Sequence, residues 1–177
     1  GASIAGPTAA PATGAAPATS PTAEGVRPPA RPQLVRSVRV LVVEDNPVNQ
    51  RVARAMLAKL GCEVVLADDG QAALDRLAEA ERFDLILMDV VMPGMDGLEV
   101  TRRIRAQRTE PGLEGAEGGR LPIVAVTAHG AKEDREDCLA AGMDDWLTKP
   151  FTLDQLVARM ERWLPHAFAS RRSEEEA

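Results

Sequence analysis

The sequence has few cysteines and histidines and no excess of basic residues, and each shortage excludes a class of protein. Its two cysteines, Cys62 and Cys138, are not clustered with each other or with the two histidines, so neither a disulfide framework nor a cysteine–histidine metal site is expected. They indicate free thiols in a reducing cytoplasm. The 21 basic residues are scattered and outnumbered by 27 acidic ones, which gives a net charge of −6 and argues against binding to nucleic acid.

Long apolar runs are missing as well. No run approaches the roughly 18 residues that a membrane-spanning helix requires. The N-terminal residues also lack the basic segment and the continuous apolar segment of a signal peptide. The sequence therefore predicts a soluble cytoplasmic chain without direct membrane contact, and leaves open whether a longer parent protein is attached to a membrane.

The composition divides the 177 residues into three parts, of which only the middle one has a folded pattern. Residues 1–37 contain seven of the 13 prolines with ten alanines and four glycines, and show no helical or strand periodicity. Such a segment buries too little apolar surface to fold, which predicts a disordered linker or, equally, a ragged terminus. Residues 38–165 have the pattern of one domain, and residues 166–177 are expected to form a charged flexible tail.

Between residues 38 and 165, strand-like and helical patterns alternate five times. Short apolar runs predict strands at 38–43, 62–67, 84–88, 123–126 and 145–147, and helical spacing predicts helices at 48–60, 71–80, 98–106, 132–141 and 153–164. Residues 107–120 are rich in Gly, Glu and Pro and predict an exposed loop. Strict alternation predicts a doubly wound α/β fold with a five-stranded parallel sheet covered on both faces.

Polar residues follow four of these predicted strands. Glu44 and Asp45 follow the first, Asp89 the third, Thr127 the fourth and Lys149 the fifth. The carboxyl ends of parallel strands meet at one edge of a doubly wound sheet, so these side chains are expected to lie together. Three carboxylates in one site repel one another unless a cation neutralises them, which favours Mg²⁺ with its preference for oxygen ligands.

The remaining groups suit the transfer of a phosphoryl group. Magnesium keeps coordination positions open for phosphate oxygens, and Lys149 and Thr127 add a positive charge and a hydroxyl donor. Asp89 is then the expected nucleophile, because carboxylates are established phosphoryl acceptors. Each residue alone has an ordinary structural explanation as a cap or a solvated surface charge. Their coincidence at four strand ends favours the functional interpretation.

Four motifs in order resemble the receiver domain of two-component signalling proteins, over nearly all of residues 38–164. They are VVEDNPVNQ at 42–50, MDVVMPGMDG at 88–97, VTA at 126–128 and LTKPF at 147–151. The first motif is most similar to receivers at the C-terminus of hybrid histidine kinases. The resemblance implies a flavodoxin-like (β/α)5 fold with strand order 2-1-3-4-5.

The resemblance also implies a role for each acidic residue. Asp89 would be the phosphoacceptor and a magnesium ligand, with Asp45 a direct ligand and Glu44 a ligand through water. Val91 would give its backbone carbonyl to the metal. These four positions are the metal site implied by the family.

On the phosphoryl side, the resemblance implies that Lys149 pairs with one phosphoryl oxygen and Thr127 hydrogen-bonds another. Ala128 would contribute its backbone N–H. The Lys149–Pro150 peptide bond is expected to be cis, as in the family.

Two positions depart from the family pattern or modify it. Receivers usually carry Tyr or Phe three residues before the lysine, a ring that turns inward when the threonine moves to the phosphate, and here Trp146 stands there. Trp146 is either a switch partner of Thr127 or a static aromatic at a partner-binding face. His129 occupies a position where receivers tune the access of hydrolytic water, or is simply a solvated histidine.

The resemblance implies a phosphorelay receiver that accepts a phosphoryl group from a phosphohistidine and then switches its protein–protein contacts. The donor would be the dimerisation and phosphotransfer domain of a histidine kinase or a histidine phosphotransfer protein. The chain itself would carry self-phosphorylation and dephosphorylation chemistry, and a parent protein would be the histidine kinase. The alternatives are a free-standing response regulator and a pseudo-receiver that acts without phosphorylation. A haloacid-dehalogenase-like phosphatase is disfavoured, because it requires a second Asp where Val91 stands.

Overall fold

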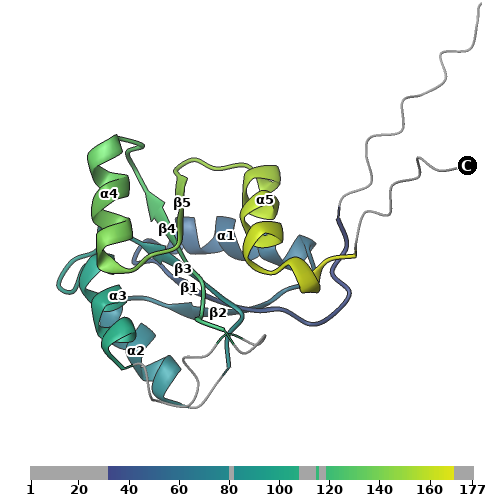
Figure 1. The fold of residues 1–177 in the computed structure, drawn as a ribbon, viewed down its shortest axis with the longest axis horizontal. Helices are drawn as coiled ribbons and strands as arrows, with labels where there is room; N and C mark the ends of the chain where they lie inside the picture. Colours follow the sequence, from purple (N-terminus) through teal and green to yellow (C-terminus); the bar gives the residue numbers. More distant parts are fainter. Residues whose placement is uncertain (1–31, 80–81, 108–114, 116–118, 170–177) are drawn as a thin grey trace, which may run out of the picture. The chain divides into compact units, whose positions relative to one another are not determined.

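The computed structural model describes residues 32–79, 82–107, 115 and 119–169, and these form five strands alternating with five α-helices (Figure 1). The sheet is parallel with strand order β2-β1-β3-β4-β5, so the predicted α/β fold class is confirmed. The predicted ends differ from the observed ones by at most two residues, the usual uncertainty of such boundaries. In chain order the elements are β1 (Arg39–Val43), α1 (Pro47–Lys59), β2 (Glu63–Ala67), α2 (Gly70–Ala78), β3 (Leu85–Asp89), α3 (Gly97–Ala106), β4 (Ile123–Thr127), α4 (Lys132–Ala141), β5 (Asp145–Thr148) and α5 (Leu153–Trp163).

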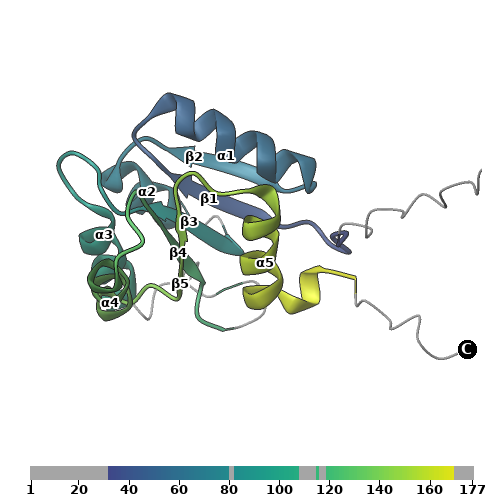
Figure 2. The same cartoon turned by 90° about the horizontal axis from the view of Figure 1, so that it is seen from above.

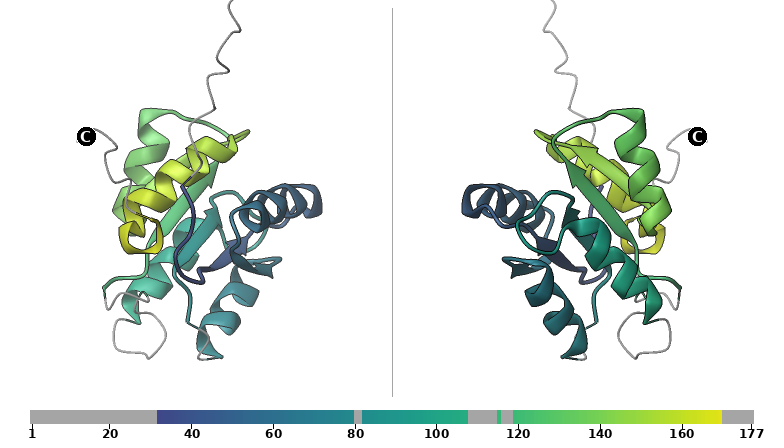
Figure 3. Two further views of the ribbon diagram at one scale, coloured as in Figure 1. Left: turned by 90° about the vertical axis from the view of Figure 1, so that its right-hand side faces the viewer. Right: turned by 90° about the vertical axis from the view of Figure 1, so that its left-hand side faces the viewer.

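The helices cover both faces of the sheet, and each face has its own hydrophobic core. Successive residues of a strand point to opposite faces, so in β1 Leu41 and Val43 pack towards α2, α3 and α4. Val40 and Val42 pack towards α1 and α5 (Figures 2 and 3). The central strands β3 and β4 are buried along their whole length, which explains why their sequences are almost continuously apolar.

The helices are short, and four of the five begin at a residue whose side chain caps them. Asn46, Asp69, Asp96 and Thr152 each accept a backbone N–H with their side chains at the start of α1, α2, α3 and α5. The five helices have 9 to 13 residues, and none in the described part of the chain is long and apolar enough to cross a membrane. These caps fix where the four helices start, each after the carboxyl end of the preceding strand, whereas α4 starts without a side-chain cap.

The folded body extends beyond both predicted boundaries. Residues 33–35 run antiparallel to residues 167–169, with a bridge between Leu34 and Phe168. The Val35 N–H donates to the Ala167 carbonyl and the Ala169 N–H to the Gln33 carbonyl, both at 2.9 Å. Phe168 is only 6% exposed and belongs to the core beside α1 and α5. Residues 33–35 and 167–169, which the sequence assigned to the linker and the tail, are thus paired with each other; residues 1–31 and 170–177 lie outside the described part.

Substituting Phe168→Ala is expected to lower the free energy of unfolding by about 3 kcal/mol, since it removes a buried aromatic ring and leaves a cavity. Urea unfolding of the full chain measures this change. The matched control is His166→Ala, because His166 lies in the same short 3₁₀ turn but is exposed and should cost less than about 0.5 kcal/mol. Equal stabilities for the two variants would contradict the packing of this C-terminal segment.

Candidate functional site

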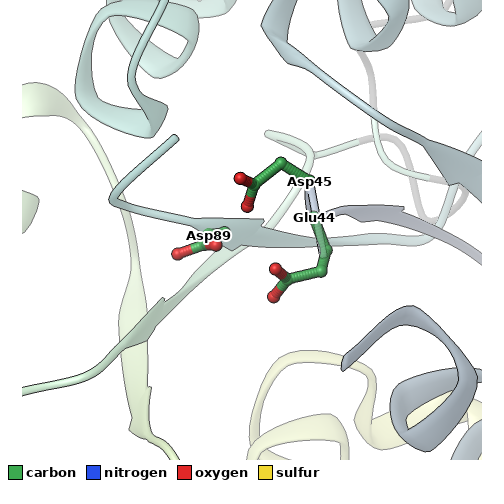
Figure 4. A group of neighbouring side chains, drawn as sticks. All are labelled: Glu44, Asp45 and Asp89. Carbon is green, nitrogen blue, oxygen red and sulfur yellow. The ribbon is translucent and has the colours of Figure 1, made fainter. Parts of the chain in front are cut away.

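Three carboxylates meet at the carboxyl end of the central strands. Asp89 is the last residue of β3, and Glu44 and Asp45 follow β1 directly. One carboxylate oxygen of each residue lies within 4.8 Å of the others, and Figure 4 shows the three side chains beside the ends of neighbouring strands. Glu44 and Asp89 are each 5% exposed, whereas Asp45 is open to solvent. Two of the three carboxylates are thus buried at the sheet edge, and the third is accessible to solvent.

Lys149 brings the positive charge to this cluster from the turn after β5. Its Nζ lies 2.7 Å from Glu44 Oε2 and 3.2 Å from Asp89 Oδ2. Its backbone N–H donates to the Thr127 carbonyl at 2.7 Å, which continues the pairing of β4 with β5 past the last strand residue. The Lys149–Pro150 bond is cis, as the family resemblance implied. The structure thus brings together the acids and the amine that the strand ends predicted.

The site contains three carboxylates and one ammonium group, so its negative charge exceeds its positive charge. The pKa values of the groups show which carboxylate is least well neutralised. Burial, and then the negative charge of Glu44, raise the pKa of Asp89 to about 6. Burial also acts to raise the pKa of Glu44, but hydrogen bonds from Lys149 and from the Asn46 N–H outweigh it and the net shift is downward. The pKa of Lys149 is raised, since its contacts with Glu44 and Asp89 outweigh its burial. The excess negative charge therefore falls on Asp89.

This donor set fits Mg²⁺. Three carboxylates face one ammonium group, and only oxygen atoms are offered as ligands, which is the chemistry that a small hard divalent cation prefers. Glu44, Asp45 and Asp89 would hold it. The Val91 N–H donates to Asp89 Oδ1 at 3.2 Å, which places Val91 beside the cluster, and the role expected for its carbonyl stays a prediction.

The turn after Asp89 is held in place by a glycine that no other residue can replace. A Cβ atom on Gly97 would lie 2.1 Å from the Asp89 carbonyl oxygen, so only glycine allows α3 to start against the backbone of β3. The Gly97 N–H donates to the Val90 carbonyl at 3.0 Å. Gly94 has a φ of +80°, which lets the turn reverse direction. This close approach fixes the backbone that carries the Asp89 carboxylate.

The expected switch residues lie on the last two strands of the sheet. Thr127 ends β4, and its hydroxyl donates to the carbonyl of His129; Ala128 and His129 are exposed. Trp146 in β5 is half-buried and packs partly against the core beneath α2, α3 and α4. The guanidinium carbon of Arg135, from α4, lies 5.1 Å from the centre of one of its rings, a cation–π contact. Whether Trp146 moves on phosphorylation stays a prediction.

The sequence reasoning missed polar residues of α1 that support Glu44. Asn49 Nδ2 lies 3.3 Å from Glu44 Oε1, and Gln50 Nε2 donates to the Glu44 backbone carbonyl at 2.6 Å. Gln50 is 8% exposed, so it occupies a core position of the helix. The signal was available, because Gln50 precedes the buried Ala53 and Leu57 by three and seven residues and shares their helix face.

A comparison with protein families identifies the arrangement. Residues 40–161 match the family model of the response regulator receiver domain, which is more than half of the chain. The chain belongs to this family. Like other receivers, it therefore presents its acidic cluster at the carboxyl edge of a 2-1-3-4-5 parallel sheet.

Individual relatives place the chain more narrowly within the family. It is 45% identical over 116 residues to hybrid signal transduction histidine kinase I of Dictyostelium discoideum, covering 63% of this chain and 6% of that protein. The chain spans between 6% and 15% of the length of the curated relatives that it matches. The similarity is thus to receiver regions of much longer sensor kinases.

Two solved structures share the fold. The receiver domain of sensor histidine kinase PA1611 from Pseudomonas aeruginosa PAO1, with a magnesium ion coordinated in its active-site cleft, is 48% identical with a TM-score of 0.61, covering 72% of this chain and 98% of that one. The receiver domain of Ssk1 from Saccharomyces cerevisiae, in complex with the histidine phosphotransfer protein Ypd1, gives a match 29% identical with a TM-score of 0.64, covering 76% and 94%.

Proposed function

We propose that this receiver accepts a phosphoryl group from a phosphohistidine onto the Asp89 carboxylate. The observation that supports this most strongly is the placement of Asp89, buried at the end of β3 beside two more carboxylates and 3.2 Å from the Lys149 ammonium. With a pKa of about 6, the Asp89 carboxylate is ionised at neutral pH and able to act as a nucleophile. The magnesium-bound receiver of PA1611 supports the same chemistry at this sheet edge.

In the transfer step, an Asp89 carboxylate oxygen bonds to phosphorus while the bond between phosphorus and the donor imidazole nitrogen breaks. The electron pair of that bond stays on the imidazole nitrogen, which takes up a proton from solvent. Mg²⁺, when bound, supplies positive charge to both the carboxylates and the phosphoryl oxygens. Lys149, released from its contacts with the carboxylates, pairs with one phosphoryl oxygen. The Thr127 hydroxyl and the Ala128 N–H are the further donors.

A protein partner is expected on the face of α1 that adjoins the acidic cluster. Val48 and Val52 are exposed there at 64% and 48%, although both are large apolar residues. Next to them lies a cavity of about 300 Å³, lined mainly by apolar side chains of α1, three strands and Phe151, with Glu44 and Lys149 in its wall. We propose that the histidine-bearing helices of a phosphotransfer protein or of a kinase dimerisation domain dock on this face. The complex of the Ssk1 receiver with Ypd1 supports a partner of this kind.

The longer protein is proposed to be a hybrid histidine kinase, in which this receiver takes phosphate from an attached or separate kinase. The similarity to the Dictyostelium hybrid kinase supports this origin. A free-standing response regulator is the alternative. A pseudo-receiver is disfavoured because all acidic positions and the lysine are filled.

The acceptor role is tested with a small phosphodonor such as phosphoramidate in the presence of Mg²⁺. Intact-mass measurement should show one phosphoryl group on the unsubstituted protein and none on Asp89→Asn. Asp96→Asn is the matched control, because Asp96 caps α3 nearby and Asn fulfils the same capping role. Phosphorylation of Asp89→Asn to the same extent would contradict the proposal, and so would its absence from the unsubstituted protein.

The docking face is tested separately with Val52→Glu. A buried charge at the partner interface should slow transfer from a phosphorylated histidine phosphotransfer protein about tenfold or more, whereas labelling by phosphoramidate should be unchanged. Leu139→Glu is the control, since Leu139 is equally exposed at 48% but lies on α4. Slower labelling by both donors would point to damage at Asp89, and equal transfer rates would rule out docking on α1.

A further inference from the structure

The Gln50 side chain joins three parts of the fold through one amide nitrogen. Gln50 lies on the buried face of α1, and its Nε2 donates to the Glu44 carbonyl at 2.6 Å and to Asp68 Oδ1 at 2.7 Å. A side-chain amide nitrogen carries two hydrogens, so both are used. The bonds tie α1 to the residue that follows β1 and to the residue that follows β2. The two strand ends beside the acidic cluster are thereby held at a fixed separation.

The backbone of Glu44 is therefore hydrogen-bonded through both its N–H and its carbonyl group. Its N–H donates to the Ala67 carbonyl at 3.1 Å, and its carbonyl accepts from Gln50. Because the peptide group is planar, fixing the Glu44 carbonyl also fixes the direction in which the chain enters Asp45. Asp45 itself is exposed and follows the last residue of β1 by two positions. One of its carboxylate oxygens lies within 4.8 Å of an oxygen of Asp89, so the backbone that Gln50 holds carries Asp45 beside Asp89.

A buried amide is a costly way to fill a position on the buried face of α1. An apolar side chain of similar size would fill the same space without the cost of desolvating an amide. The position carries Gln, and the two hydrogens of its amide nitrogen are donated to residues that follow β1 and β2, not to acceptors within the helix. This arrangement restrains the strand ends, which apolar packing alone does not do.

We infer that Gln50 is a positioning residue for the acidic pair Glu44–Asp45: anchored by its bond to Asp68, it holds the Glu44 carbonyl and so sets the geometry in which the pair faces Asp89 to bind a divalent cation. The inference rests on the proposed function to the extent that this cluster binds Mg²⁺. Gln50 does not touch the cation or the phosphoryl group. Its loss is therefore expected to weaken Mg²⁺ binding and leave the cluster itself in place.

The test is Mg²⁺ titration of the full chain by calorimetry, with urea unfolding of the metal-free protein as a second readout. Gln50→Met keeps the length and helix propensity of the side chain but removes both donors, and should raise the Kd for Mg²⁺ about tenfold or more, as is typical for residues that orient metal ligands. Gln71→Met is the matched control: Gln71 is exposed on α2, and its amide bonds only Asp75 as far as the described residues show. Its Kd should be unchanged.

A second pair of variants tests the same restraint from the exposed end, in case Gln50→Met does not fold. Asp68→Asn and Asp68→Ala remove the same charge, but only Asp68→Ala removes the acceptor that anchors Gln50. Asp68→Ala should therefore bind Mg²⁺ about threefold more weakly than Asp68→Asn.

Three results overturn the inference, and they are distinguishable. A folded Gln50→Met protein with unchanged Mg²⁺ affinity shows that Gln50 only stabilises the fold. Equal affinities for Asp68→Asn and Asp68→Ala show that the bridge to Asp68 does not restrain the site. Absence of Mg²⁺ binding by the unsubstituted protein overturns the proposed function itself, and the inference with it.

Discussion

Repulsion between the buried carboxylates of Glu44 and Asp89, opposed by a single ammonium group, is the constraint on which this site depends. Glu44 and Asp89 are buried, and Lys149 contacts both of them. Lys149 lies closer to Glu44 than to Asp89, so Glu44 is well neutralised and Asp89 carries the excess charge. A carboxylate in this state is stabilised by a bound cation. The same imbalance therefore accounts for metal binding.

The rest of the fold holds these like charges together. Strands β3 and β4 are fully buried, and the two core layers that they separate supply the stability against which the repulsion acts. Gly97 lets α3 start against the Asp89 backbone, and the Glu44 backbone is bonded to both β2 and α1. The acids are thus carried on rigid strand ends, as precise chemistry requires.

The alternation of apolar runs predicted the fold because each run is long enough to identify its own strand or helix. The carboxyl ends of parallel strands lie at one edge of the sheet. Polar residues at the predicted strand ends therefore indicated which side chains would lie together, namely Glu44, Asp45, Asp89 and Lys149. Helix periodicity is enough to put Gln50 on the buried face of α1, but it does not identify the partners of Gln50, because the Glu44 carbonyl and Asp68 become neighbours only after α1 packs on the sheet.

Other tertiary contacts were not predictable from the sequence for the same reason, at the amino end of the sheet and at the two boundaries of the domain. Arg105 donates to the Leu121 and Gly142 carbonyls and pairs with Asp144 at 2.7 Å, contacts between residues far apart in sequence. The pairing of Leu34 with Phe168 joins two segments whose composition favours disorder when each is considered alone. Tertiary contacts of this kind have no periodic signature in the sequence.

Unbalanced charge concentrated on Asp89 should raise the pKa of its carboxyl group, and a ¹³C NMR titration of that side chain measures this pKa. In metal-free buffer the pKa should lie near 6, above the ordinary 3.8, so that ionising Asp89 disfavours the folded state as the pH rises through this window. Saturating Mg²⁺ should lower the pKa well below 6, because a bound cation favours the charged form. A pKa near 3.8 without metal, unchanged by Mg²⁺, would show that Asp89 carries no excess charge and binds no cation.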